Sequence, residues 1–152
     1  MAHRFATRLI WTGAADGIAA TYDGYSREYR IEIDGKPALR GSSAPVYRGD
    51  ASLHNPEDLL VASLSACHML WYLHLCTDAG IHVSAYADDA EGTLAGRGGN
   101  MAFTEVILRP RVTIVQGDVE RALALHQDAN SACFIANSVN FPVRHQAVIA
   151  RA

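Results

Sequence analysis

One long apolar segment constrains the fold of this chain more than any other feature. Residues 59–76 read LLVASLSACHMLWYLHLC and contain no Asp, Glu, Lys or Arg. Apolar side chains would cover nearly the whole circumference of a helix here, so we expect it to be buried on several sides. At 18 residues, with two serines and two histidines, the segment is at the lower limit for crossing a bilayer. We therefore interpret it as a core helix, with no membrane partner.

The residues beside the apolar segment mark the ends of this helix. Asn55 suits the N-cap, Pro56 the first helical position, and the acidic pair 57–58 the positive end of the helix dipole. We predict that the helix runs to about Asp78 and stops where Gly80 can adopt a left-handed conformation. A lone chain of 152 residues has difficulty covering such a helix. We therefore predict a homodimer that shares its core.

The rest of the chain reads mainly as strands and turns. Alternation of apolar and polar residues over 29–34 is typical of a half-buried strand, and Asp34-Gly35 marks a turn after it. Residues 36–54 read mostly as loop. Strands are predicted at 5–12, 29–33, 81–94, 102–115 and 143–150, with a hairpin turn at 96–100.

A second helix is predicted after the fourth strand. Asp118 suits its N-cap, and the helix should run to about Asn130. One face would carry Val119, Ala122, Leu123 and His126. A short turn or helix is expected at 133–139. Because runs of strands are separated by helices without strict alternation, we predict an α+β fold in a single domain of residues 1–152.

Charge and the N-terminal residues limit the partners and the compartment. The net charge is −3 and no Lys/Arg cluster stands out, so no nucleic-acid partner is expected. The first eight residues, MAHRFATR, lack the apolar stretch of a signal peptide. We therefore expect a cytoplasmic location.

Three cysteines are the main candidates for chemistry. Cys67, Cys76 and Cys133 form no CxxC pair and fit no zinc-finger or zinc-ribbon spacing. In a reducing compartment a disulfide is more often catalytic or transient than structural. Cys76 lies nine residues after Cys67, on another side of the helix, so we interpret it as a core residue.

Histidines near these thiols leave two alternatives open. A metal site from Cys67, His68, His74 and Cys133 matches no familiar ligand spacing, so no metal or cofactor is expected. A Cys–His hydrolase needs a histidine and an orienting group within reach of the thiol, and nothing in the sequence selects His126 or His145 for that role. His68 reads as a packed or interface histidine, because adjacent helical residues do not face each other.

Three segments together resemble the OsmC/Ohr family. They are HNPEDLL at 54–60, SACH at 65–68 and NSACFIANSV at 130–139, and Pro142 follows them. The resemblance spans nearly the whole chain. It implies an OsmC-like fold, in which two antiparallel-rich β-sheets wrap central helices in an intertwined homodimer with active sites between the subunits.

The same resemblance implies an activity, the reduction of organic hydroperoxides by a peroxiredoxin-like antioxidant enzyme. Cys67 would be the peroxidatic cysteine and Cys133 the resolving cysteine. Glu57 matches the family's glutamate that partners a catalytic arginine, and Arg48 is the arginine that we carry over. An external dithiol would reduce the resulting disulfide, and no cofactor is implied.

Physical chemistry supports these roles. Peroxide reduction needs a thiolate, and burial raises the pKa of a cysteine, so a nearby guanidinium is required to offset that penalty. A carboxylate that holds the guanidinium in a bidentate pair would fix its direction. Apolar neighbours such as Leu64, Leu70 and Trp71 would favour an organic hydroperoxide over hydrogen peroxide.

Two other classes of function stay open. In the first, the chain is a binding or redox-sensing protein that holds a hydrophobic small molecule in its interface pocket without turnover. In the second, it is a structural or interaction protein with no peroxide chemistry. The presence of both Cys67 and Cys133 favours the enzyme, because a binding pocket does not need a resolving thiol.

Overall fold

The chain is α+β, as predicted. Its structure, a computed structural model, describes residues 1–152 except the side chain of Arg97. The chain forms two compact units, residues 1–59 and 60–152, and the boundary falls in the first turns of α1 (Pro56–Asp78). The single domain expected from the chain length stays a prediction.

The first unit contains one small antiparallel sheet. Its order is β1 (Arg8–Trp11), β2 (Tyr29–Glu32) and β3 (Leu39–Gly41). Gly35, with a φ of 74°, makes the predicted turn between β2 and β3 possible. Two 3₁₀ turns, η1 (Thr12–Ala15) and η2 (Pro45–Tyr47), lie in the connections. The strand predicted at 5–12 is shorter than expected, because only residues 8–11 pair with β2.

The helix α1 begins and ends where the sequence predicts. The side chain of Asn55 accepts a hydrogen bond from the backbone N–H of Asp58 at 2.8 Å, and the Asp58 carboxylate accepts one from the N–H of Asn55 at 3.5 Å. This reciprocal pair is a capping box. Gly80, with a φ of 69°, follows the C-terminal end.

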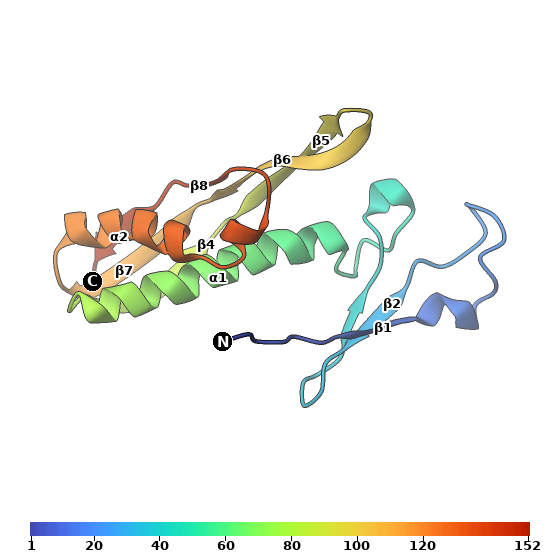
Figure 1. Cartoon of the computed structure of the whole chain (residues 1–152), viewed down its shortest axis with the longest axis horizontal. Coiled ribbons are helices and arrows are strands. Elements are labelled where there is room, and N and C mark those ends of the chain that lie inside the picture. Colours follow the sequence, from blue (N-terminus) through green and yellow to red (C-terminus); the bar gives the residue numbers. More distant parts are fainter. The chain divides into compact units, whose positions relative to one another are not determined.

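The second unit packs two helices with two three-stranded sheets (Figure 1). One sheet has the order β4-β7-β9 and the other β5-β6-β8, and the last strand of each is parallel to its neighbour. The predicted hairpin turn joins β5 to β6, with Gly98 and Gly99 at positive φ. The strands are β4 (His82–Asp88), β5 (Glu91–Arg97), β6 (Asn100–Leu108), β7 (Pro110–Gln116), β8 (Val143–His145) and β9 (Val148–Arg151).

Three of the predicted strands were wrong in length, because each divides into two. The segment 81–94 forms β4 and β5, 102–115 lies within β6 and β7, and 143–150 lies within β8 and β9. Each break moves the chain from one sheet to the other. Asp88 stabilises the break, because its carboxylate accepts hydrogen bonds from the N–H of Arg109 at 2.6 Å and the hydroxyl of Ser65 at 2.5 Å.

The helix α2 (Val119–Ala132) begins at the predicted cap, since the Asp118 carboxylate accepts a hydrogen bond from the N–H of Arg121 at 2.7 Å. Its predicted buried face was partly wrong. Leu123 is 46% exposed, whereas Leu125 is 1% exposed. The four buried residues are Ala122, Leu125, His126 and Ala129. A short 3₁₀ turn, η3 (Ala136–Ser138), lies within the predicted segment 133–139.

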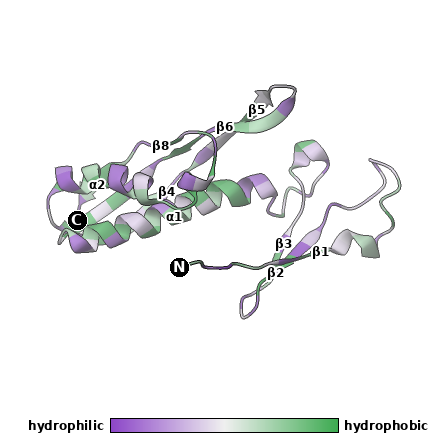
Figure 2. Ribbon diagram, in the orientation of Figure 1, coloured by the Kyte–Doolittle hydropathy of each residue, from purple (hydrophilic) through white to green (hydrophobic). Residues whose placement is uncertain are grey.

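Burial of α1 is narrower than the sequence suggests. Its fully buried residues are Leu64, His68, Tyr72 and Cys76, a stripe with one residue every four positions. Figure 2 shows apolar residues along the helix beyond those that the stripe buries, and Leu70 is 63% exposed. By length and composition alone α1 could also cross a membrane, which is weak evidence because core helices pass the same test. The homodimer that would cover its other faces stays a prediction.

The buried stripe of α1 joins two groups of core residues. Leu64 packs with Val106 and Leu108 of β6. Tyr72 and Cys76 belong to a larger cluster with residues of α2 and β7 and with Ile81, just before β4. The remaining members of that cluster are Ile81, Val112, Ile114, Ala122, Leu125 and Ala129.

The contrast between two leucines of α2 gives a test of this core. We expect Leu125→Ala to lower the free energy of unfolding by about 2–5 kcal/mol, because it leaves a cavity in a closely packed cluster. Leu123→Ala, on the same helix, should cost less than about 1 kcal/mol, since that side chain is largely solvated. Urea unfolding monitored by circular dichroism measures both, and equal losses would contradict the assigned face of α2.

Candidate functional site

The thiols of Cys67 and Cys133 lie close together in the second unit. Cys67 is half-buried near the middle of α1, and Cys133 is the 1% exposed C-cap residue of α2. The pKa of Cys133 is raised to about 11, first by burial and then by a hydrogen bond with Cys67, against the lowering effect of the Ala136 N–H. Both thiols are free. The structure therefore brings together the two cysteines that the sequence pairs, while their redox roles stay predictions.

An apolar surface lies on the Cys67 face of α1. Leu70, Trp71 and His74 follow Cys67 by three, four and seven residues, the spacing of one helix face, and they line a pocket of about 230 Å³. The ring of Phe134, next to Cys133, meets that of Trp71 edge to face with 5.3 Å between centroids. An apolar ligand could therefore rest against this face of the helix.

Three histidines from three elements gather in the core of the second unit. His68 of α1 and His126 of α2 are hydrogen-bonded, with 2.9 Å between Nε2 of His68 and Nδ1 of His126. The two rings are within 5° of parallel, and His126 stacks on Tyr72 with 3.8 Å between centroids. The ring centroid of His145 of β8 lies 5.8 Å from that of His68 and 5.9 Å from that of His126.

Burial keeps this cluster neutral at pH 7. It lowers the pKa of His68 to about 4, with a smaller contribution from His145, and that of His126 to about 3, with smaller contributions from the other two histidines. The outer ring nitrogens, Nδ1 of His68 and Nε2 of His126, are buried and have no partner among the described atoms. One is an N–H and the other a lone pair in either tautomer, because the inner nitrogens share one proton.

A metal centre gains no support from this arrangement. Within the part of the chain that the structure describes, no three His, Cys, Asp or Glu side chains are placed to hold a metal ion. The inner nitrogens of His68 and His126 face each other in a hydrogen bond, so they do not converge on a common point. The metal alternative raised by the sequence therefore lacks a ligand set here.

Glu57, in the first unit, carries a buried oxygen without a partner. Its Oε2 is shielded from solvent and accepts no hydrogen bond from the described atoms. Burial raises the pKa of Tyr29, and the negative charges of Glu57 and Asp58 raise it further, which places these groups near one another. A carboxylate in this position requires a donor or a cation.

Arg48 contacts residues other than Glu57, its predicted partner. Its guanidinium pairs with Asp23 at 2.9 Å and lies 5.4 Å from the ring centre of Tyr22, so it does not pair with Glu57 in this structure. Arg48 has a φ of 65°, the one positive φ at a non-glycine residue in the described backbone. Strained backbone of this kind gathers at functional sites. The role of Arg48 as the activating arginine stays a prediction.

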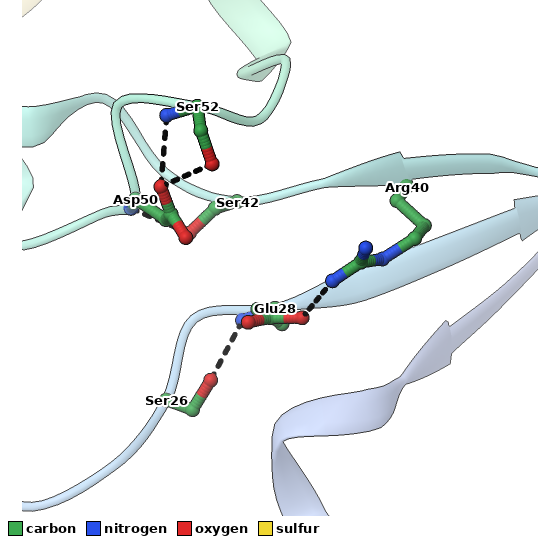
Figure 3. Close-up of polar contacts among 6 residues, drawn as sticks. All are labelled: Ser26, Glu28, Arg40, Ser42, Asp50 and Ser52. Carbon is green, nitrogen blue, oxygen red and sulfur yellow. Dashed lines mark hydrogen bonds and ion pairs between the residues drawn. The ribbon is translucent and has the colours of Figure 1, made fainter.

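The loop that carries Arg48 is fixed by its own polar contacts. Figure 3 shows Asp50 donating its N–H to Ser42 Oγ at 3.1 Å, while its carboxylate accepts from the N–H and the hydroxyl of Ser52 at 2.8 and 2.7 Å. Gly49 passes so close to Ser43 that an added Cβ would lie 1.5 Å from the Ser43 carbonyl oxygen. The backbone on both sides of Arg48 is therefore constrained.

The sequence does not predict the histidine cluster. It indicates that His68 is a packed or interface residue, and it selects neither His126 nor His145 for a role. His68 and His126 are 58 residues apart, and no local spacing relates them. The available signal was the position of His126 on the apolar face of the second predicted helix, which indicates burial but names no partner.

Comparison with known proteins relates the chain to one family. A family model described as "OsmC-like protein" matches residues 49–147. The chain is 30% identical to an OsmC-like protein of unknown function from Vibrio cholerae, with a TM-score of 0.88 over 97% of this chain and 100% of that one. A search of curated proteins gave no match.

Two more distant structures share the fold. An organic hydroperoxide resistance protein from Legionella pneumophila is 17% identical, with a TM-score of 0.68 over 97% of each chain. One from Elizabethkingia anophelis is also 17% identical, with a TM-score of 0.67 over 100% of both chains. The chain thus has the OsmC/Ohr fold that its motifs predict.

The neutral histidines predict a loss of stability in acid. In the unfolded chain the imidazole of His68 takes up a proton near pH 6.5, whereas burial in the folded chain lowers its pKa to about 4. The free energy of unfolding should therefore fall by roughly 3 kcal/mol between pH 6.5 and pH 4 through His68 alone. Urea unfolding from pH 7 to 4 measures this loss. The double variant His68→Gln/His126→Asn should lack this component, and the exposed-site control His82→Gln should retain it. Equal pH slopes in all three proteins would contradict the assignment.

Proposed function

This chain belongs to the OsmC-like protein family, and on that premise we propose that it is a thiol-dependent peroxidase that reduces organic hydroperoxides to alcohols. The observation that carries the proposal is the contact between Cys67 and Cys133, which come from different helices. Further support comes from the organic hydroperoxide resistance proteins that share its fold.

The proposed cycle has two steps. In the first, the Cys67 thiolate attacks one peroxide oxygen, the O–O bond breaks, and the alkoxide takes up a proton to leave as an alcohol. Cys67 is then a sulfenic acid. In the second, the Cys133 sulfur attacks the Cys67 sulfur, the S–S bond forms, the S–O bond breaks, and water leaves. The two thiols thus lose two electrons and two protons to the hydroperoxide.

Burial of Cys133 sets a condition on the second step. Because the pKa of its thiol is raised to about 11, Cys133 holds its proton at pH 7 and must release it during the attack. The leaving hydroxide of the sulfenic acid can accept that proton and depart as water. Because a protonated thiol is a poor nucleophile, Cys133 does not compete with Cys67 for the hydroperoxide.

Other participants complete the proposal. A dithiol of the reducing cytoplasm would reopen the disulfide by exchange. The predicted homodimer would cover the apolar faces of α1 that the single chain leaves exposed, Leu70 among them. The predicted roles of Arg48 and Glu57 in activating Cys67 belong to the same proposal. They are supported by the strained backbone of Arg48 and by the unpartnered carboxylate oxygen of Glu57.

A second candidate function is binding or sensing without turnover. The pocket lined by Leu70, Trp71 and His74 favours it, because that pocket, on the same face of α1 as Cys67, could hold an apolar molecule whether or not the thiol reacts. The two candidate functions differ in the number of thiols that a hydroperoxide oxidises. A peroxidase loses two thiols per chain, whereas a protein that only binds a ligand loses none.

Thiol counting tests the enzyme directly. We expect one equivalent of cumene hydroperoxide to remove two free thiols per reduced chain, because one disulfide forms. Cys67→Ser should abolish the loss, Cys133→Ser should leave a trappable sulfenic acid, and Cys76→Ser should behave like the parent protein, since Cys76 is a core residue. Titration with a thiol reagent and intact-mass measurement give the counts. A parent protein that retains all its thiols would refute the peroxidase.

Substrate preference tests the apolar surface. We expect cumene hydroperoxide to be reduced at least about tenfold more efficiently than hydrogen peroxide, because each buried methylene contributes about 0.8 kcal/mol of binding. Trp71→Ala should narrow this ratio by removing pocket wall. The kcat/KM of each substrate, followed by peroxide consumption with a dithiol reductant, is the measurement. Equal efficiencies in the parent protein would rule out this substrate class.

A further inference from the structure

The hydrogen bond between His68 and His126 joins the two helices that position the reactive thiols. His68 directly follows Cys67 in α1, and His126 lies seven residues before Cys133, two turns back along α2. Together with the thiol pair, this bond is a polar link between α1 and α2. The two helices also meet through the stacking of His126 on Tyr72 and through apolar packing.

We propose that His68 and His126 are a positioning pair that holds Cys67 and Cys133 at the separation needed for disulfide formation. The proposal rests on the proposed function insofar as these two cysteines are the pair that is oxidised. It assigns the histidines no contact with substrate and no proton transfer to sulfur. Their role is to set how α1 lies against α2.

Because the hydrogen bond between His68 and His126 is buried, breaking it is costly. His68 is 1% exposed and His126 is not exposed at all, so no solvent replaces the bond if it breaks. Apolar side chains can slide past one another at small cost, whereas a buried ring nitrogen that loses its partner loses a hydrogen bond that water cannot replace. Rotation or translation of α1 relative to α2 is therefore opposed at the point next to Cys67.

The surrounding rings restrict the bond further. His126 is stacked on Tyr72, one turn after His68 on α1, within 8° of parallel. The His68 and His126 rings are nearly parallel as well, and His145 of β8 lies against both. Packing against neighbouring rings thus limits the rotation of each histidine ring. The hydrogen bond therefore restricts both the distance and the angle between the two helices.

The test uses side chains that reach, or fail to reach, the bonded atoms. His68 bonds through Nε2, which a glutamine amide can replace and the shorter asparagine amide cannot. His68→Gln should therefore retain the thiol arrangement, while His68→Asn, equally polar, should lose it. His126 bonds through Nδ1, so His126→Asn is the conservative variant and His126→Leu the disruptive one.

The measurement is the equilibrium constant of the Cys67–Cys133 disulfide in dithiothreitol redox buffers, in a Cys76→Ser background. The disulfide is first formed with diamide, which accepts the two electrons and two protons from the thiols and becomes a hydrazine, so peroxidase activity is not required. We expect His68→Asn to lower the constant by about tenfold, a typical coupling between contacting groups. His68→Gln should stay within about twofold of the parent protein.

Further variants separate positioning from general destabilisation. The double variant His68→Asn/His126→Leu should lower the constant no more than either single change, because both remove the same bond. His82→Gln, at an exposed histidine of β4, should leave it unchanged. Circular dichroism identifies any disruptive variant that fails to fold, in which case the comparison of His68→Gln with the parent protein and with His126→Asn carries the test.

The outcomes distinguish this inference from the proposed function. A disulfide that forms in every folded variant with the same equilibrium constant would overturn the positioning role and leave the peroxidase intact. A parent protein in which diamide joins no Cys67–Cys133 pair would overturn both. An equal fall of the Cys67–Cys133 equilibrium constant in His68→Gln and in His68→Asn would also overturn the inference. The effect would then not depend on a hydrogen-bonding atom at the position of His68 Nε2.

Discussion

Packing of α1 against α2 is the constraint on which the rest of the second unit depends. Neither helix carries a complete site. Cys67 lies on α1 and Cys133 caps α2, and their thiols meet only because a stripe of α1 and a face of α2 bury each other. The stripe has one residue in four, so it places a histidine and a tyrosine, His68 and Tyr72, in the same buried layer as the aliphatic residues. The chemistry of the site follows from that layer.

Burial has opposite consequences for the two kinds of titratable group in this layer. It raises the pKa of Cys133, which stays a thiol, and lowers the pKa of His68 and His126, which stay neutral. In both cases the neutral form is favoured because the charged form loses its hydration. At pH 7 this leaves no formal charge on these three groups. Activation of Cys67 would then need a charge from elsewhere, which is the role that the family resemblance predicts for Arg48.

Two residues of the first unit that are predicted site residues are each in an unusual state. Glu57 keeps a buried carboxylate oxygen without a partner, and Arg48 sits on strained backbone while paired with Asp23. The contacts between Ser42, Asp50 and Ser52 fix the loop in which Arg48 lies.

Elements whose signals are local can be predicted from neighbouring residues alone. The limits of α1 follow from Asn55, Pro56 and Gly80, because capping and left-handed glycine depend on a few neighbouring residues, and the motifs around Cys67 and Cys133 indicated the family. Three other features appear only in the folded chain. They are the breaks near Asp88 and Arg109, the face of α2 that holds Leu125, and the hydrogen bond between His68 and His126. Those features depend on which strand or helix lies opposite. A side chain's partner across 58 residues is set by packing, for which no local spacing in the chain carries a signal.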